Sequence, residues 1–296
     1  MGAYTIRELE NLSGIKAHTI RIWEKRYGLI APHRTSTNIR TYCDSELRKL
    51  LNISILNRNG LKISKIARLS QDEIAQQVNH FNEDVTSTEN QVESLTLAMI
   101  DMDEYRFEQV LARSIIKFGF EEAVMHVVYP FFVKVGLMWQ TGSISPVQEH
   151  FVSGIIRQKF FVAIDSLAGN DKPGVPRFVF FLPEGEYHEF GLLFFCYMAK
   201  KRGFQTIYLG QSLPIDDLPD LARSKKIDYL VTSSSTSING KNVLSFIKQL
   251  SSLFPEQVVF VSGSGTQQVT GNIPAKVILI HAPSEFIARL ETIAAT

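Results

Sequence analysis

The sequence has few of the features that mark secreted, metal-binding or membrane proteins. It has 2 cysteines among 296 residues, Cys43 and Cys196, and neither has a second Cys or a close His at metal-ligand spacing. They give no basis for a disulfide framework or a zinc site, and we expect both thiols to be reduced, buried and inert. Apolar runs such as 178–183 and 258–262 are far shorter than the roughly 20 residues that span a bilayer. Met1–Glu8 has no signal-peptide core, so a soluble, cytoplasmic protein is expected.

Motifs of common enzyme classes are also missing. No Gly-x-Gly-x-x-Gly follows the first expected strand of the C-terminal half, and the five-residue Gly-x-Ser-x-Gly pattern of hydrolases is absent. Gly263-Ser264-Gly265 lacks the His and acid partners that a serine nucleophile needs. The sequence therefore favours a protein that is not an enzyme.

The net charge of +1 hides an asymmetry along the chain. Residues 1–80 hold 13 Lys and Arg against 7 Asp and Glu, whereas residues 81–296 hold 18 against 23. A partner made of phosphates is therefore expected for the N-terminal part alone.

Turn residues and periodicity divide the chain into three folded parts. Residues 1–75 predict four short helices: Thr5–Leu12, His18–Tyr27, Ser45–Asn59 and Lys62–Leu69. Thr5 and Asp44 are expected to cap the N-termini of their helices, and Gly28 and Gly60 to terminate theirs. Residues 76–88 are polar and predict a linker or a connecting helix. Residues 89–170 predict a four-helix bundle, with helices over Leu95–Met102, Phe107–Phe118, Glu121–Met138 and Pro146–Leu167.

A change of period after the breaker-rich segment 170–174 predicts an α/β domain over residues 175–296. Five short β-rich runs alternate with helical segments, which argues a Rossmann-like five-stranded parallel sheet with helices on both faces. The strands are expected at Arg177–Leu182, Thr206–Leu209, Tyr229–Thr232, Val258–Val261 and Val277–Ile280, and the helices at Phe190–Lys201, Asp216–Ser224, Lys241–Leu253 and Ser284–Ile293. Ligands of such sheets bind beyond the carboxyl ends of the strands.

The first two expected helices are separated by a short turn that contains Gly14, as in a helix-turn-helix motif. The second helix of that motif presents its first turns to the major groove, and His18, Thr19 and Arg21 lie there, while Ile20, Ile22 and Trp23 include the inward face. The polar segment 34–42 suits a wing that contacts phosphates. A generic helical domain with solvated Arg and Lys is the alternative.

The amino-acid sequence of this region also resembles that of a known family. Residues 4–9 (Tyr-Thr-Ile-Arg-Glu-Leu) and 19–29 (Thr-Ile-Arg-Ile-Trp-Glu-Lys-Arg-Tyr-Gly-Leu) resemble the winged helix-turn-helix domain of the MerR family, in the branch that carries a vitamin B12-type domain. The resemblance implies a dimer that bends or distorts a promoter with inverted half-sites. It implies DNA contacts from His18, Thr19, Arg21, Arg26, Arg34, Arg40 and Tyr42.

A histidine loop is the second signal. His188 follows the first expected strand, with Glu186 two residues before it. A neutral imidazole is a good ligand for cobalt, and a carboxylate that accepts the other ring N–H would fix its tautomer. A lone His is otherwise more often a solvated one.

Glu186-x-His188-x-x-Gly191 resembles the Asp-x-His-x-x-Gly signature of cobalamin-binding domains, in which the His replaces the dimethylbenzimidazole base below cobalt. The family places Ser-x-Leu after 41 further residues and Gly-Gly another 27 later; here those spacings lead to Ser233-Ser234-Ser235 and Gly263-Ser264. The departures are Glu186 for Asp, Ser235 for Leu and Ser264 for the second Gly. The resemblance implies a cofactor site that includes Glu186, His188, Gly191, Ser233, Ser235 and Gly263, with His188 as the cobalt ligand.

Trp139, nine residues and then Glu149-His150 form the third signal. Taken alone, Trp139 would be assigned to the core and Glu149 to a helix N-terminus. The pattern resembles that of the light-sensing CarH and LitR group, in which the bundle covers the upper face of adenosylcobalamin. The resemblance implies that Trp139 packs on the adenosyl group, with Glu149 and His150 near it. Some members have His after this Trp; here it is Gln140, so water or His150 would take the upper position after photolysis.

These signals predict a transcription repressor that binds promoter DNA and is controlled by adenosylcobalamin, or methylcobalamin, and by light. The cofactor would favour one oligomeric state, a dimer or tetramer, whose linked DNA-binding domains gain avidity. In one alternative the B12-like domain has lost cobalamin and binds a protein, which Ser235, Ser264 and Gln140 favour. In another the C-terminal half is a methyl-carrying corrinoid module, against which the DNA-binding domain speaks.

Overall fold

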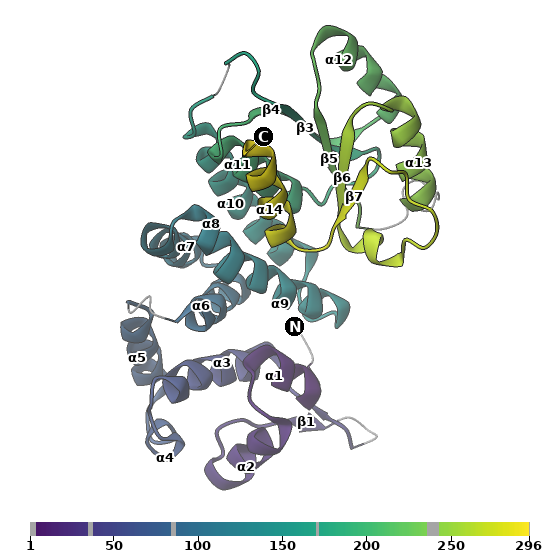
Figure 1. The fold of residues 1–296 in the computed structure, drawn as a ribbon. Coiled ribbons are helices and arrows are strands. Elements are labelled where there is room, and N and C mark those ends of the chain that lie inside the picture. Colours follow the sequence, from purple (N-terminus) through teal and green to yellow (C-terminus); the bar gives the residue numbers. More distant parts are fainter. Residues whose placement is uncertain (1–3, 35–37, 84–86, 170–171, 236–242, 296) are drawn as a thin grey trace. The chain divides into compact units, whose positions relative to one another are not determined.

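The computed structural model describes residues 4–34, 38–83, 87–169, 172–235 and 243–295 (Figure 1). The chain forms two compact units, Met1–Ile156 and Arg157–Thr296. The first is almost entirely helical and the second contains a five-stranded parallel sheet, so the expected combination of α and α/β parts is confirmed. Within the described ranges, every helix is too short or too polar to cross a membrane.

The N-terminal part of the first unit is a helix-turn-helix followed by a small wing. Its elements are α1 (Ile6–Ser13), α2 (Ala17–Tyr27), β1 (His33–Arg34), β2 (Arg40–Thr41), α3 (Asp44–Arg58), α4 (Ile63–Ile66) and α5 (Gln71–Glu83). Thr5 caps α1 as predicted, and Glu8 completes a reciprocal capping pair with it. Gly14 has a φ of 71°, a left-handed conformation that ends α1 and makes the turn to α2. The polar stretch after residue 70 is the connecting helix rather than a loop.

Three expectations in this part are wrong. Asp44 is the first residue of α3 and Cys43 holds the N-cap position, where its side chain makes no capping hydrogen bond. Cys43 is also half-buried rather than buried, and its pKa is lowered, first of all by the hydrogen bond with the Ser45 hydroxyl 3.0 Å away. Ile22 points outward, with 52% of its surface exposed, so only Ile20 and Trp23 form the inward face of α2.

The helical bundle contains α6 (Thr88–Asp101), α7 (Glu104–Phe118), α8 (Phe120–Ala123), a π-helical turn (Val124–Val128), α9 (Tyr129–Gln140) and α10 (Pro146–Asp165). The third predicted helix is thus interrupted by a wider turn just before Pro130, whose ring and missing N–H are incompatible with a regular α-helical ladder. Helix α6 starts earlier than predicted. Every residue from Asn90 to Ile100 is buried, so the amphipathic period that marks a helix is missing there.

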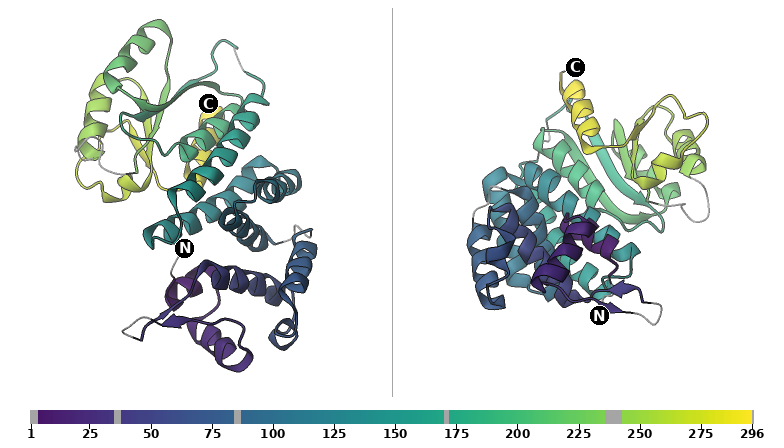
Figure 2. Two further views of the ribbon diagram at one scale, coloured as in Figure 1. Left: turned by 180° about the vertical axis from the view of Figure 1, so that it is seen from behind. Right: turned by 90° about the horizontal axis from the view of Figure 1, so that it is seen from below.

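The sheet of the second unit has the strand order β4-β3-β5-β6-β7, and all its neighbours are parallel. The strands are β3 (Arg177–Pro183), β4 (Gln205–Leu213), β5 (Tyr229–Ser233), β6 (Val258–Ser262) and β7 (Val277–Ile280). The helices are α11 (Phe190–Lys201), α12 (Leu218–Ser224), α13 (Val243–Leu253) and α14 (Pro283–Ala294); a 3-10 turn (Ile215–Asp217) replaces the predicted start of α12, and residues 241–242 lie outside the described part. Figure 2 shows this unit from two further sides.

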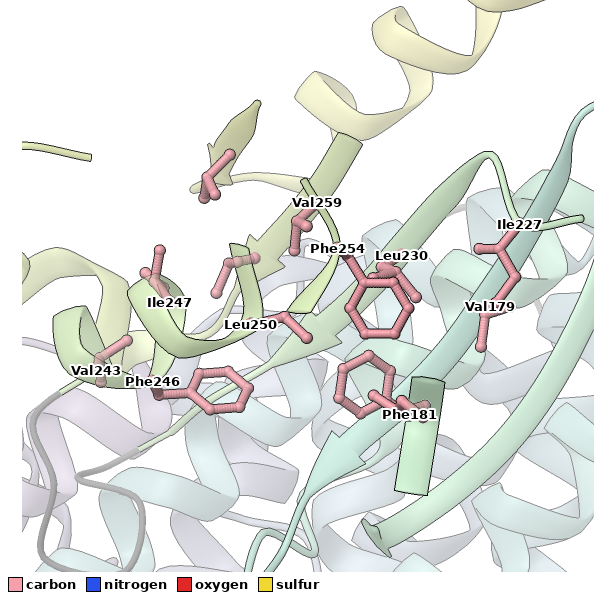
Figure 3. Packing of buried hydrophobic residues seen from close by; sticks show 13 residues of the cluster. Val179, Phe181, Ile227, Leu230, Val243, Phe246, Ile247, Leu250, Phe254 and Val259 are labelled. Carbon is pink, nitrogen blue, oxygen red and sulfur yellow. The ribbon is translucent and has the colours of Figure 1, made fainter. Parts of the chain in front are cut away.

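Alternation along β3 explains the two covered faces. Val179 and Phe181 pack with α12, α13 and their neighbours (Figure 3), and Phe178 lies against the rings of Phe260 and Phe286 on the opposite face. Because the chain leaves β3 toward β4 on one side and later returns to β5 on the other, the loops after β3 and β5 diverge. A ligand crevice forms at such a switch point.

Candidate functional site

The loop after β3 is organised by the buried carboxylate of Glu186. Its Oε1 accepts hydrogen bonds from the backbone N–H groups of Tyr187 and His188, both 3.0 Å away, and lies 2.6 Å from His188 Nδ1. Its Oε2 accepts hydrogen bonds from the backbone N–H of Ser235 at 2.8 Å and from the Ser235 hydroxyl at 2.6 Å. Ser235 follows β5, so a single carboxylate joins the two loops that diverge at the switch point.

These bonds keep Glu186 ionised. Burial by itself would raise the pKa of this carboxyl group, but the hydrogen bonds from His188 and Ser235 outweigh burial and hold the pKa well below its usual range. An ionised carboxylate only accepts hydrogen bonds, so the Nδ1 of His188 carries the proton. The imidazole is 79% exposed, and in this tautomer Nε2 carries the lone pair with which an imidazole can bind a metal.

The serines that depart from the expected signature are engaged in the same site. Ser235 stands where the signature has leucine, and its hydroxyl donates a hydrogen bond to the second carboxylate oxygen of Glu186. The Ser264 hydroxyl donates a 2.7 Å hydrogen bond to the Ser235 carbonyl oxygen. The Ser235 hydroxyl therefore links the loops after β3 and β5, and the Ser264 hydroxyl links the loops after β5 and β6.

The two glycines of the predicted site differ in what requires them. A Cβ atom at Gly263 would lie 2.2 Å from the Ser234 carbonyl oxygen, and its φ is 98°, so the fold itself requires glycine there. A Cβ atom at Gly191, in the first turn of α11, would meet nothing within 4 Å. Open space at Gly191 lies one helical turn from His188.

One polar cluster beside His188 carries no short-range sequence signal. Buried Glu189 accepts a 2.6 Å bond from Arg157 Nε on α10 and a 2.7 Å bond from the Tyr208 hydroxyl on β4. Burial and the neighbouring carboxylate raise the pKa of Tyr208 well above its usual range. The residue after His188 is therefore anchored to the helix and to the strand that flank it.

Removal of the Arg157 cation tests this anchor. We expect Arg157→Ala to lower the unfolding free energy of the second unit by about 1–3 kcal/mol, because the substitution leaves a buried carboxylate without its cation, although Arg157 itself is partly solvated. The control is Arg223→Ala, whose ion pair with Asp220 is solvent-exposed and contributes at most about 0.5 kcal/mol. Hydrogen exchange of the β3 and β4 amides measures both; equal effects would contradict the assignment.

The first unit holds the residues predicted for the upper face. Trp139 lies in the last turn of α9 and is 50% exposed, so it is not a core residue. Glu149 and His150 lie in the first turns of α10, where Glu149 Oε2 is 2.8 Å from His150 Nδ1 and Glu149 Oε1 accepts a bond from the Ser153 hydroxyl. Gln140, next to Trp139, is exposed as well.

The predicted DNA-contacting residues fall into two groups. His18, Arg21 and Arg26 are exposed on α2, Thr19 is half-buried there, and Arg34 is exposed in the wing with its Nη1 2.6 Å from the Asn38 side chain. Arg40 and Tyr42 instead turn toward Glu24 of α2, each with a 3.4 Å bond to its carboxylate. Tyr42 is only 1% exposed and its pKa is raised to about 12, mainly by burial, so it holds the wing against α2.

Comparison with known families gives two matches, both of them almost entirely within the first unit. Residues 4–73 match the family described as MerR HTH family regulatory protein, and residues 91–163, from α6 to α10, match the family described as B12 binding domain. The chain is a MerR-type regulator with a B12-binding domain. This confirms the resemblance found in the sequence and identifies a DNA-binding transcription regulator that carries a cobalamin-binding module.

Relatives and solved structures extend the match for this MerR-type regulator. It is 26% identical over 276 residues to the HTH-type transcriptional repressor CarH of Myxococcus xanthus, covering 89% of this chain and 90% of CarH. It is 25% identical over 212 residues to the repressor CarA of the same organism, covering 71% of this chain and 68% of CarA. A Methanosarcina barkeri monomethylamine corrinoid protein shares the fold over 70% of this chain and 100% of its own, with a TM-score of 0.56 at 16% identity.

Proposed function

We propose that this MerR-type regulator is a repressor controlled by adenosylcobalamin and light, with His188 as the lower ligand of cobalt. The observation that carries the proposal is the Glu186 clamp: an ionised, buried carboxylate fixes the Nδ1–H tautomer of an exposed imidazole at the switch point of a parallel sheet. That donor arrangement fits a cobalt ligand, since a hydrogen-bonded carboxylate orients an imidazole and raises its basicity. Ser233, Ser235, Gly191 and Gly263 would line the same site.

The adenosyl form is proposed from the first unit. An exposed indole in the last turn of α9 and an acid–imidazole pair in the first turns of α10 suit a nucleoside, because Trp139 can stack on adenine and Glu149 can accept hydrogen bonds from ribose hydroxyls. When bound, adenosylcobalamin supplies a light-labile cobalt–carbon bond. The protein's own residues would bind and orient the cofactor and change their contacts when that bond breaks. No catalytic turnover is implied.

The link to DNA is proposed to be oligomerisation. Cofactor contacts that favour one assembly, a dimer or tetramer, place several helix-turn-helix domains on one duplex, and the second binding event then gains from high effective concentration. Exposed His18, Arg21, Arg26 and Arg34, with Thr19 beside them, would contact DNA directly. Arg40 and Tyr42 would support the wing. The repressor sign follows the name of the CarH relative.

The alternative proposal is a MerR-type regulator whose B12-like domain has lost cobalamin and binds a protein. Ser264 favours it, since its side chain stands where the nucleotide tail would approach the backbone. A methyl-carrying corrinoid module is disfavoured by the helix-turn-helix domain, and the corrinoid protein of similar structure shows the shared fold alone.

A DNA-binding experiment tests the proposed function. Duplexes are selected from a random pool by the full-length protein loaded with adenosylcobalamin in the dark, and affinity for the selected duplex is measured before and after green light. We expect tight binding in the dark and at least about tenfold weaker binding after illumination, as loss of a linked binding event predicts. Selection that succeeds equally without cobalamin, with no effect of light, would support the protein-interaction alternative.

Substitution of Gly191 separates the fold from the ligand site. Gly191→Ala is expected to leave the sheet unit as stable as before or more stable by about 0.5–1 kcal/mol, because alanine is the better helix former and finds open space. Cobalamin affinity is expected to fall, because the added methyl group stands one turn from His188. Thermal unfolding without ligand and equilibrium dialysis with adenosylcobalamin measure the two effects. Unchanged affinity would place the corrin away from the start of α11.

A further inference from the structure

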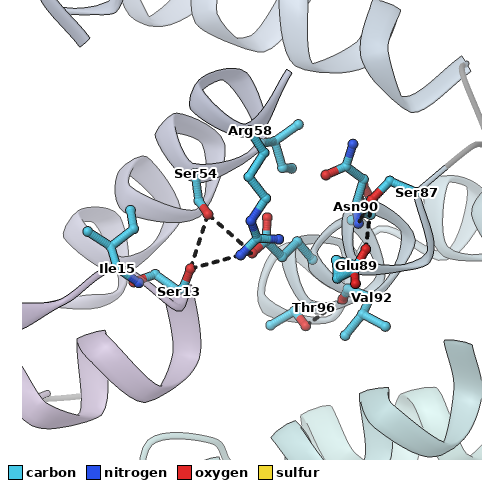
Figure 4. A network of polar contacts seen from close by, with 12 residues as sticks. Ser13, Ile15, Ser54, Arg58, Ser87, Glu89, Asn90, Val92 and Thr96 are labelled. Carbon is cyan, nitrogen blue, oxygen red and sulfur yellow. Dashed lines mark hydrogen bonds and ion pairs between the residues drawn. The ribbon is translucent and has the colours of Figure 1, made fainter. Parts of the chain in front are cut away.

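Helix α6 of the bundle presents a buried carboxylate to the DNA-binding part of the same unit. Glu93 is 1% exposed, and its Oε1 lies 2.9 Å from Arg58 Nη2 and 3.3 Å from the Ser54 hydroxyl, both on α3 (Figure 4). Arg58 and Ser54 also donate hydrogen bonds to the Ser13 carbonyl oxygen, at 3.2 and 3.1 Å. Ser13 ends α1, so these two side chains connect Glu93 to the helix-turn-helix turn.

The turn itself is shaped around this contact. Gly14 follows Ser13 with a left-handed φ, and a Cβ atom there would lie 3.1 Å from Arg58 Nη2. The guanidinium is therefore held between the turn that positions α2 and the carboxylate of the bundle. A displacement of Glu93 would therefore move Arg58 and, with it, the turn that precedes α2, the helix expected to enter the major groove.

The contact between Glu93 and Arg58 contributes little net stability to the packing of the two parts. Burial raises the pKa of Glu93, against the opposing effects of Lys134 on α9 and Arg58 on α3. Glu93 Oε2 has no hydrogen-bond partner among the described residues. The same is true of Nε2 and Oε1 of Gln91, on the same helix. Partly satisfied buried polar groups cost folding free energy, so apolar residues would bind the two parts together more tightly.

Two more contacts join the same two parts. Arg48 on α3 forms a 2.6 Å ion pair with Asp101 at the end of α6. The buried Tyr4 hydroxyl, next to the wing, donates a 3.1 Å bond to the Ser143 carbonyl oxygen. Ser143 lies in the connection between Trp139 and α10. The DNA-binding part is thus connected both to α6 and to the turn that follows the exposed indole.

Docking leaves the DNA-reading face accessible. Arg21, Lys25 and Arg26 of α2 all remain exposed while α3 contacts the bundle. The contact therefore fixes the direction in which α2 points, and it does not mask α2.

We propose that Glu93, Arg58 and Ser54 form a coupling joint through which the bundle sets the orientation of the helix-turn-helix and hence the spacing of the recognition helices in the oligomer. Because half-site spacing on DNA is set by that geometry, a rigid joint converts a change in the bundle into a change in DNA affinity. The proposal rests on the proposed function for the oligomer and for the nature of the signal. The joint itself is testable without cobalamin and without DNA.

The test measures the distance between spin labels on Lys25→Cys and Ile116→Cys in a Cys43→Ser, Cys196→Ala background. Both label sites are exposed, one on α2 and one on α7. The otherwise unaltered protein is expected to give one narrow distance distribution. Arg58→Glu, which opposes Glu93 with a second carboxylate, is expected to broaden it, and Arg58→Glu with Glu93→Lys is expected to narrow it again. The control is Glu104→Gln, since Glu104 is an exposed acid in the first turn of α7.

A broad distribution before any change at position 58, or a narrow one after Arg58→Glu, would overturn the joint. Circular dichroism melting shows whether Arg58→Glu still folds; if it does not, Arg48→Glu tests the same interface from its other end. In the DNA experiment, the dark-to-light ratio of affinities is expected to approach one in Arg58→Glu. A ratio equal to that of the unaltered protein would overturn the coupling, whereas the lack of a light effect in the unaltered protein contradicts the proposed function alone.

Discussion

Replacement of His188 by alanine is expected to lower the affinity for adenosylcobalamin by at least about 100-fold. Loss of a residue that only orients a metal ligand already costs about 10–100-fold, and His188 is the proposed ligand itself. Glu186 would lose the imidazole but keep its bonds to the Tyr187 and Ser235 N–H groups, so the loop is expected to remain folded. Equilibrium dialysis in the dark measures the effect.

The control for that experiment is His281→Ala. His281 is an exposed histidine of the same unit, outside the loops after β3, β5 and β6. Its replacement is expected to leave affinity unchanged. If His188→Ala binds as tightly as His281→Ala does, cobalt is not held by His188 and the proposed site is wrong.

Gly263→Ala is expected to lower the unfolding free energy of the sheet unit by about 2–4 kcal/mol. The added Cβ would lie 2.2 Å from the Ser234 carbonyl oxygen and 2.8 Å from the Ser233 hydroxyl, and alanine disfavours the φ of 98°. The ends of β5 and β6 would have to separate, which would also displace Ser235 from Glu186.

Hydrogen exchange of the β5 and β6 amides measures this loss of stability. Gly169→Ala is the matched control, because a Cβ there would contact nothing within 4 Å. We expect the control to change the opening free energy by less than about 0.5 kcal/mol. Equal effects of the two substitutions would show that the close approach at Gly263 does not constrain the site.

The elements of the sheet unit could be predicted because short apolar runs alternate with helical segments and turn-forming or polar residues separate them. Helix α11 has the predicted bounds, and β7 matches its predicted run, since breakers or polar residues flank both. The bundle was less predictable. Helix α6 is buried on all sides and loses its period, and Pro130 forces a π turn that a hydrophobic pattern does not reveal.

The site was predictable only as far as short spacing carries information. Glu186 and His188 are two residues apart, so their pairing follows from sequence, whereas Glu189 meets Arg157 and Tyr208 across 32 and 19 residues. Ser235 looked like a departure from a motif until the structure placed its hydroxyl on Glu186. Tyr42 looked available for DNA, yet it lies buried beneath the wing, because exposure depends on packing that the local sequence does not encode.

The most direct test of the account is electron paramagnetic resonance of the protein loaded with cob(II)alamin after growth on ¹⁵N-histidine. The unpaired electron of cobalt couples to the axial nitrogen, so the isotope of the ligand sets the splitting. If His188 is the ligand, each cobalt line is split into a doublet by ¹⁵N, and the doublet disappears in His188→Ala. Triplet splitting from the ¹⁴N of the cofactor's own base, or no axial nitrogen at all, would contradict the account.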